Sequence, residues 1–446
     1  GDKHGNILHC FERECSIQRR HQKIIEEAPS PAVDEKLREA LGKSAIEAAK
    51  TLNYFSTGTV EFLLSEQEFY FLEVNTRLQV EHPVTEEILG IDLVREQIRI
   101  AENKKLSFSQ DDLQICGHAI EARVYAEDPQ KNFLPSPGKI QTWAPSFSDN
   151  VRFDSGVEEG SFVSPEFDPM IAKVICHAPT RTEAAKSLAK SLRNTKLYGI
   201  KNNKEFLELT LLSKSFLDGD TTTDFIERVN PNRIRELSSK NLEEAAIAIA
   251  MESQAINRNS ARVMRGIRSG WRNSVMPPQT LKLESKKTEM ELTYQSQRDG
   301  SFSVSLNAGE PKRAKVFSAG YGEIDIEIDG FRSKYEALKI DRTWYLQNYR
   351  GQIEFKEVPK ASSEKDEDFS SEIKAPMPGS VIKTFFGEQD KVSKGDTILI
   401  LEAMKMEHQI LAPRNGTISR LHARTGDQVS NNQTLVSFDD EGEKSR

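Results

Sequence analysis

The sequence predicts a multidomain α+β fold in three parts, and three observations support this prediction. Helical and strand patterns alternate over residues 1–225, which is typical of one α+β domain. Residues 226–358 hold one helix that is apolar on most sides, followed by short alternating runs, and this order predicts a β-barrel wrapped around a helix. Residues 371–440 contain an internal repeat, which predicts a small, flattened β-sandwich. The length of 446 residues leaves room for about three domains.

Helices and strands can be placed within the first two parts. Leucines and alanines at helical spacing follow Asp34, a residue type that caps helices, and strands are expected at 59–64 and 69–74. In the second part the helix is expected at 242–251, with burial on several sides. The strands of the barrel are expected at 281–283, 290–294, 302–306, 323–329, 344–346 and 353–355.

The third part follows a polar, charged segment at 359–370, which predicts a mobile linker because it has few apolar residues to bury. Beyond the linker, residues 379–399 align with residues 416–436 at a constant offset, and Asp390 then falls on Asp427. A repeat of this length predicts two similar four-strand halves that pack face to face.

Lys405 lies between Met404 and Met406, at a predicted turn between two short apolar strands of the sandwich. A rigid hairpin tip would keep this lysine exposed, so the pattern indicates a lysine amine that carries a prosthetic group. The alternative is an ordinary solvated turn lysine beside methionines that fill the core. The repeat favours the prosthetic arm, because it gives the lysine a defined place in the fold.

Charge and composition argue against two kinds of partner. The net charge is -8, and the basic run at 19–23 is too short for a nucleic-acid surface. No apolar run reaches the roughly 18 residues of a membrane span. The absence of an initiator Met or targeting segment leads us to expect that Gly1 marks a cut. The spacing of the four cysteines fits neither a zinc site nor a disulfide framework, so we expect a reducing compartment. These cysteines are Cys10, Cys15, Cys116 and Cys176.

Two glutamates are expected to face each other across a strand pair. If the strands at 59–64 and 69–74 form a hairpin that turns at Gln67, Glu61 lies opposite Glu73. Two carboxylates in this position repel each other unless a cation lies between them. Mg²⁺ suits the place, because it binds a few carboxylate oxygens and bridges nucleotide phosphates.

The residues after Glu73 extend this chemistry. Asn75 follows on the same strand face and supplies an amide oxygen or a phosphate contact. Arg77 offers a planar fork for a small oxyanion such as bicarbonate. Glu81 is close enough to act as a general base beside a bound anion. The alternative is a charged, exposed strand face with chance alternation, and the number of roles that coincide argues against it.

The segment 401–408 (LEAMKMEH) resembles the biotin carboxyl carrier domain of biotin-dependent carboxylases, and the resemblance extends over about 371–440. It implies that Lys405 carries covalent biotin, attached by a biotin protein ligase. Lipoyl domains are similar in fold, but their lysine usually has an acidic neighbour, whereas both neighbours of Lys405 are Met.

The first part resembles the C-terminal part of a biotin carboxylase of the ATP-grasp class, through Glu61 and the segments 16–23, 73–82 and 117–123. The resemblance implies ATP, bicarbonate and Mg²⁺ (or Mn²⁺) as ligands. It implies that Glu81 deprotonates bicarbonate and that Arg123 stabilises the biotin enolate. The implied metal ligands are Glu61, Glu73 and Asn75, and the implied ATP-binding residues are Gln18, His21, Lys23 and Asn75. The residues implied to bind bicarbonate or biotin are Arg77, Gln79, Val80, Arg123 and Asp168. The implied catalytic residues are Lys23, Arg77, Glu81 and Arg123.

One departure from the family concerns the phosphate loop. The family has a glycine-rich loop whose backbone N–H groups cover the triphosphate, and no such glycine run occurs in these 446 residues. The resemblance therefore implies a chain that lacks its N-terminal part. We expect these residues alone to be inactive in ATP-dependent biotin carboxylation.

The middle part resembles the helix-in-barrel domain that joins the two subunits of acyl-CoA carboxylases, although a purely structural spacer is the alternative. The order of the three parts is similar to that of the biotin-containing α subunit, most like the methylcrotonyl-CoA type and next the propionyl-CoA type. This order implies a carboxyltransferase β subunit that acts on the acyl-CoA, an α6β6 assembly, and a bacterial cytoplasm or mitochondrial matrix as compartment.

Alternatives remain open on substrate and on function class. A propionyl-CoA or geranyl-CoA carboxylase α subunit would have the same three parts, because the β subunit selects the substrate. An ATP-grasp carbon–nitrogen ligase without biotin would need Glu61 and Glu73 but not Lys405. A non-catalytic biotin carrier or scaffold would need Lys405 but not the charged face of residues 73–81. Since the chain has both features, a carboxylase subunit is favoured.

Overall fold

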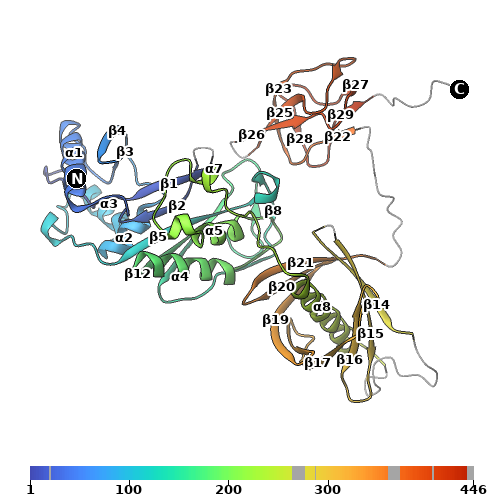
Figure 1. Ribbon diagram of the computed structural model, residues 1–446. Helices are drawn as coiled ribbons and strands as arrows, with labels where there is room; N and C mark the ends of the chain where they lie inside the picture. The colour runs from blue at the N-terminus through green and yellow to red at the C-terminus, as the bar shows by residue number, and fades with distance from the viewer. Residues whose placement is uncertain (20–21, 264–276, 287, 360–371, 404–405, 439–446) are drawn as a thin grey trace. The chain divides into compact units, whose positions relative to one another are not determined.

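The computed structural model describes residues 1–19, 22–263, 277–286, 288–359, 372–403 and 406–438 (Figure 1). Arg235–Ser371 forms one compact unit, and Gly1–Ile234 with Glu372–Arg446 forms the other. In the latter, the residues before 235 and those after 371 build separate sheets, and the predicted three-part α+β fold is confirmed. The predicted linker lies, apart from residue 359, outside the described residues.

A five-stranded antiparallel sheet forms the centre of the first part (Figure 1). Helix α4 (Arg181–Asn194) packs on one face, where Leu188 joins the core, and helix α2 (His82–Leu89) packs on the other through Val84 and Ile88. The strands, in their order across the sheet, are β1 (Glu14–Arg19), β2 (Gln22–Ala28), β5 (His118–Tyr125), β12 (Met170–Ala178) and β10 (Val151–Ser155).

Shorter elements surround this sheet. Helix α1 (Glu35–Thr51) begins as predicted after Asp34, whose carboxylate accepts a hydrogen bond from the Leu37 N–H (2.8 Å). The other helices are α3 (Leu93–Ala101), α5 (Lys204–Leu211), α6 (Lys214–Leu217), α7 (Phe225–Val229) and the 3₁₀ turns Gln110–Asp112 and Pro129–Lys131. The short strand pairs are β6 (Glu127–Asp128) with β7 (Leu134–Pro135), β8 (Gly138–Lys139) with β11 (Phe162–Val163), and β9 (Thr142–Ala144) with β13 (Lys196–Tyr198).

The two faces of the sheet differ in charge. Alternate residues of a strand point to opposite faces, so Ala122 of β5 joins the core under α4 whereas Ala119 packs under α2. Glu121 and Arg123 continue the α2 face and are buried although they are charged. Glu81, which immediately precedes α2, reaches this charged area. The charged end of the α2 face is therefore a candidate for a reaction site.

Strands β3 (Thr59–Ser65) and β4 (Glu68–Asn75) form a separate antiparallel hairpin. The predicted pairing of Glu61 with Glu73 is confirmed. The predicted register is wrong nearer the turn, because a bulge follows Glu61 and Phe62 pairs with Phe71.

The second unit is a closed antiparallel barrel with one long helix, as predicted, and it has eight strands where six were expected (Figure 1). Helix α8 (Ser239–Asn259) shares a core with the barrel through its residues 245–251, which pack with side chains such as Leu283 and Trp344. No helix in the described part of the chain is long and apolar enough to cross a membrane. The strands are β14 (Gln279–Ser285), β15 (Thr288–Ser296), β16 (Phe302–Leu306), β17 (Lys312–Ser318), β18 (Glu323–Ile328), β19 (Phe331–Ile340), β20 (Thr343–Asn348) and β21 (Gly351–Glu357).

The third part is a sandwich of two four-stranded sheets. The prediction that each half of the repeat forms its own sheet is wrong, because each sheet takes strands from both halves. One sheet has the order β22 (Glu372–Lys374), β29 (Thr434–Phe438), β27 (Gly416–Leu421), β24 (Lys391–Val392), and the other β26 (Met406–Leu411), β25 (Thr397–Ala403), β23 (Gly379–Thr384), β28 (Gln428–Val429).

Candidate active site

Glu61 and Glu73 share one hydrogen-bond donor, Asn75, at the end of the β3–β4 hairpin. The Asn75 Nδ2 donates to Glu73 Oε1 (2.7 Å) and to Glu61 Oε1 (3.2 Å). Gln79 Nε2 (2.5 Å) and Lys23 Nζ (3.0 Å) also donate to Glu61 Oε1. These donors offset the repulsion between two carboxylates that face each other across the strand pair.

Lys23, Glu81 and Arg123 form a second cluster, joined to the first through Lys23. The Lys23 ammonium is 2.7 Å from Glu81 Oε1 and 3.0 Å from Glu61 Oε1. The Arg123 Nη2 is 2.9 Å from the other oxygen of Glu81, Oε2. Glu81 is only 2% exposed, so a buried carboxylate is held by one cation on each oxygen.

The surrounding cations set the charge of Glu81. Burial alone would raise the pKa of its carboxyl, but the hydrogen bond and charge of Lys23, with the charges of Arg13 and Arg123, lower that pKa to about 2. In this arrangement Glu81 is ionised and a weak base. It becomes a stronger base when either cation turns toward another anion.

Arg77, Gln79 and Val80 lie in the loop between β4 and α2. The buried Gln79 contacts Glu61 as described above, and the Val80 carbonyl accepts a hydrogen bond from Lys173 Nζ (2.9 Å). Arg77 is exposed, and its Nη2 donates to Asn75 Oδ1 (3.2 Å). The loop therefore brings all three predicted anion-binding residues beside the two clusters.

Of the other predicted site residues, Gln18 lies beside the second cluster, Asp168 lies apart from both clusters, and two residues lie outside the described part of the chain. Gln18 lies opposite Lys23 on the β1–β2 pair, and its amide donates to the Cys15 carbonyl (2.9 Å). The exposed Asp168 accepts a hydrogen bond from the first N–H of β12 (2.9 Å) and belongs to neither cluster. His21, a predicted ATP-binding residue, and Lys405, the predicted biotin attachment site, lie outside the described residues.

The structure adds four charged residues that are not among the predicted site residues. Arg13 Nη2 donates to Gln79 Oε1 (2.8 Å), Lys173 binds the Val80 carbonyl, and Glu26 and Glu121 are both ion-paired with Arg123. The available signal was a charged residue inside an otherwise apolar strand, as Lys173 is in β12.

The residues of the hairpin fit a divalent cation. Glu61 and Glu73 are direct partners across the strand pair, and the Asn75 amide reaches both carboxylates. A cation between the two carboxylates would replace the donors that now offset their charge, and phosphate oxygens or waters would complete its ligands.

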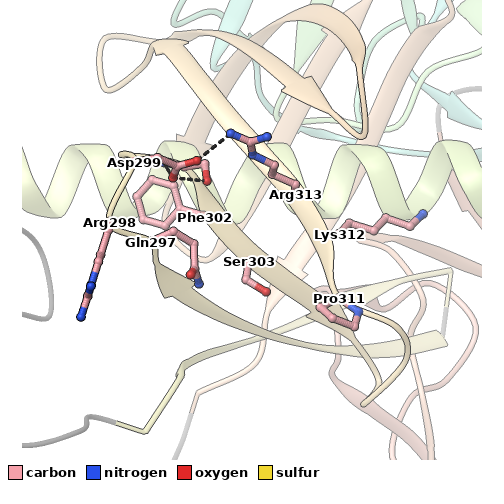
Figure 2. A pocket seen from close by; sticks show the side chains of 9 residues that line it. Gln297, Arg298, Asp299, Phe302, Ser303, Pro311, Lys312 and Arg313 are labelled. Atoms are coloured by element: carbon pink, nitrogen blue, oxygen red, sulfur yellow. Dashed lines mark hydrogen bonds and ion pairs between the residues drawn. The ribbon is translucent and has the colours of Figure 1, made fainter.

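A hollow of about 510 Å³ on the barrel differs from the two clusters in that the carboxylate in its wall already has its own partners (Figure 2). Asp299 and Phe302 lie in its wall, and an Asp299 oxygen is 2.6 Å from Arg313 Nη2. Asp299 also accepts a hydrogen bond from the Ser301 hydroxyl (2.6 Å). Its carboxylate is thus already bound, and the clusters of the first part remain the candidate site.

Four sequence families match successive segments of the chain. "Carbamoyl-phosphate synthase L chain, ATP binding domain" matches residues 1–109, and "Biotin carboxylase C-terminal domain" matches 121–228. "Methylcrotonyl-CoA carboxylase, alpha-subunit, BT domain" matches 242–360, and "Biotin-requiring enzyme" matches 371–438. The two clusters are built by residues of the first two segments.

Solved structures of biotin carboxylase domains are similar to the first part. The biotin carboxylase domain of a thermophilic 2-oxoglutarate carboxylase bound to bicarbonate is 42% identical, with a TM-score of 0.51, and 52% of each chain is covered. The corresponding domain from Hydrogenobacter thermophilus, in complex with MgADP, ADP and bicarbonate, is 40% identical, with a TM-score of 0.52 over 53% of this chain and 52% of that chain.

Curated relatives match all three parts in the same order. Methylcrotonoyl-CoA carboxylase subunit alpha, mitochondrial, of Rattus norvegicus is 38% identical over 99% of this chain and 64% of its own length. Propionyl-CoA carboxylase alpha chain, mitochondrial, of Homo sapiens is 37% identical over 98% of this chain and 62% of its own length. The chain thus spans somewhat less than two thirds of these relatives. Its successive segments match these four families, and nearly its whole length is similar to alpha subunits of methylcrotonoyl-CoA and propionyl-CoA carboxylases.

Proposed function

We propose that the chain is part of the biotin-containing subunit of an acyl-CoA carboxylase, which uses ATP and bicarbonate to carboxylate biotin on Lys405 and passes CO₂ to a partner carboxyltransferase. The observation that carries the proposal is the contact of Lys23, Glu81 and Arg123 beside the opposed glutamates of β3 and β4. A lysine for anions, a buried base and an arginine for developing negative charge are the groups that this reaction needs side by side.

Glu61, Glu73 and Asn75 would hold Mg²⁺ or Mn²⁺, which neutralises phosphate charge when it is bound. Lys23 would contact the phosphates as well, because its ammonium lies 3.0 Å from Glu61 Oε1, beside the proposed metal ligands. Gln18, on the strand beside it, would line the nucleotide site. His21 is assigned to the same site from its sequence position alone.

Glu81 would act as the general base for bicarbonate, which Arg77, Gln79 and Val80 would hold. The carboxylate takes the proton of the bicarbonate hydroxyl, that oxygen attacks the γ-phosphorus of ATP, and ADP leaves, so that carboxyphosphate forms. The pKa of Glu81 is too low for this step while both cations bind it. Because the phosphates and bicarbonate draw Lys23 and Arg123 toward themselves, the basicity of Glu81 increases when substrates are present.

Arg123 would then face the biotin ring, whose ureido nitrogen is the group that carries the carboxyl when biotin is bound. The guanidinium would offer N–H donors to the ureido oxygen, where negative charge develops as the neighbouring nitrogen loses its proton. Asp168, near the same strand ends, would contact the ring or its attachment from the solvent side. These are contacts made chiefly in the transition state, and they favour catalysis over simple binding.

Partners follow from the family. We propose a biotin protein ligase that modifies Lys405 and a carboxyltransferase β subunit, in an α6β6 assembly. The relatives named above are mitochondrial proteins, and either the mitochondrial matrix or a bacterial cytoplasm is proposed as the compartment.

The acyl-CoA that we favour is 3-methylcrotonyl-CoA, with propionyl-CoA and geranyl-CoA as the other candidates. Support comes from the BT domain family at residues 242–360 and from the relatives of the methylcrotonoyl type. The purified α/β complex, tested against a panel of acyl-CoA thioesters, is expected to turn over 3-methylcrotonyl-CoA fastest. A faster rate with propionyl-CoA would contradict the assignment.

The 446-residue chain alone is expected to be inactive in the carboxylation step. It has no glycine-rich phosphate loop, and it covers about half of the solved carboxylase domains. The measurement is bicarbonate-dependent ATP hydrolysis with free biotin, with a complete biotin carboxylase as the positive control. Steady turnover by the isolated chain would show that this expectation is wrong.

A further inference from the structure

Two buried glutamates behind Arg123 have no role in the steps described above. Glu26 of β2 and Glu121 of β5 are direct partners across the strand pair, and each is 0% exposed. Apart from the ion pairs that both glutamates make with Arg123, their four carboxylate oxygens have no hydrogen-bond partner in the described part of the chain. Two like charges in a buried cross-strand pair are costly, so their presence calls for a function.

The guanidinium of Arg123 lies between this buried pair and Glu81. Its Nη2 contacts Glu26 Oε1 and is also 2.9 Å from Glu81 Oε2, while its Nε is 3.9 Å from Glu121 Oε1. Arg123 is itself only 8% exposed. One cation is therefore bound by Glu81 at the reaction site and by two carboxylates behind it.

We propose that Glu26 and Glu121 are positioning residues that hold Arg123 at the reaction site when Glu81 takes up a proton. This inference rests on the proposed function, in which Glu81 becomes neutral during each turnover. A neutral Glu81 attracts the guanidinium less, and a buried arginine without a counter-charge would be unstable. The pair behind it remains available and keeps the guanidinium directed at the biotin ring.

The raised pKa values of Glu26 and Glu121 indicate that their ionised carboxylates lower the stability of the folded state. Burial raises the pKa of Glu26 to about 7, against the attraction of Arg123, and burial with the charge of Glu26 raises the pKa of Glu121 well above its usual range. A neutral glutamine at position 26 keeps the shape of the side chain and removes one of the two carboxyl groups that face each other across the strand pair. The folded state should therefore tolerate the Glu26→Gln change, although catalysis should not.

Glu27 offers a matched control on the same strand. It is also buried, but it points to the opposite face of the sheet, where it binds His118 (2.7 Å) and Arg181 (2.6 Å). Its removal would leave the buried His118 and the half-buried Arg181 without their carboxylate, and the Glu27→Gln change should destabilise the fold. It should have no specific effect on Arg123.

The first arm of the experiment is thermal unfolding of the 446-residue chain. Glu26→Gln is expected to leave the melting temperature unchanged or to raise it, whereas Glu27→Gln is expected to lower it. If Glu26→Gln lowers the melting temperature as much as Glu27→Gln does, Glu26 has a structural role and the proposal fails.

The second arm uses the full-length, biotinylated holoenzyme and two rates, biotin carboxylation and bicarbonate-dependent ATP hydrolysis without biotin transfer. Because Arg123 is proposed to stabilise the negative charge that develops in the biotin step, Glu26→Gln and Glu121→Gln are each expected to lower the ratio of the first rate to the second by about tenfold or more. Glu26→Asp, which keeps the charge, should restore part of the ratio. Glu27→Gln should leave the ratio at its wild-type value.

The outcomes separate this proposal from the proposed function. A wild-type holoenzyme without biotin carboxylation would overturn the function itself. An active wild type, with a ratio unchanged in both Glu26→Gln and Glu121→Gln, would overturn the positioning role. Should Glu26→Gln fail to fold, the first arm has already refuted the proposal.

Discussion

Replacement of Glu81 by Gln is expected to slow biotin carboxylation in the full-length holoenzyme by about 100- to 10,000-fold, which is the usual contribution of a positioned general base. Glu81 is buried between Lys23 and Arg123, so an amide of the same shape can keep the packing but cannot accept the bicarbonate proton. Because the substrate-binding cations remain, the loss should fall on kcat and leave the KM for bicarbonate unchanged or lower.

Glu86→Gln is the matched control for this change. Glu86 is another buried glutamate at the same helix, where it accepts a hydrogen bond from the Leu93 N–H (2.8 Å) and pairs with Arg152 (2.8 Å). It has no contact with Lys23 or Arg123 in the proposed mechanism, and its variant should retain kcat. Near-wild-type kcat in a folded Glu81→Gln enzyme would refute the assignment of the base.

Replacement of Lys405 by Arg is expected to abolish acyl-CoA carboxylation by the holoenzyme. Arginine keeps the positive charge, but it lacks the amine that a biotin ligase acylates. The variant should also lose capture by streptavidin. It should still carboxylate free biotin, because the residues proposed for that step lie in the first part of the chain.

Lys383→Arg provides the control in the same sandwich. Lys383 is an exposed residue of β23, and its replacement should leave both streptavidin capture and acyl-CoA carboxylation intact. If the Lys405→Arg holoenzyme continues to carboxylate acyl-CoA, another residue carries the prosthetic group.

Local patterns predicted the parts of the fold that depend on neighbouring residues. The two-residue period placed Glu61 opposite Glu73, and Asp34 was recognised as the cap of α1. Near the β3–β4 turn the predicted register failed, because a bulge is a backbone adjustment that no alternation of side chains announces. Strands β17 and β19 were missed because their charged residues interrupt the apolar alternation on the barrel surface.

Contacts between distant segments were beyond the reach of such patterns. The exchange of strands between the two sheets of the sandwich depends on how the repeats close over one core. In the candidate site, Arg123 of β5 is bound by Glu26 of β2, and Val80 is bound by Lys173 of β12. Only the order of the strands in the sheet brings these residues together. The family resemblance named the residues at the reaction site, but not the carboxylates behind them.

The most direct test of a biotin-dependent function is the mass of the peptide spanning residues 401–409, from protein produced in cells with active biotin ligase. We expect this peptide to carry one biotinyl group, on Lys405, and the corresponding peptide from the Lys405→Arg variant to carry none. An unmodified Lys405 from such cells would show that the chain is not a biotin carrier.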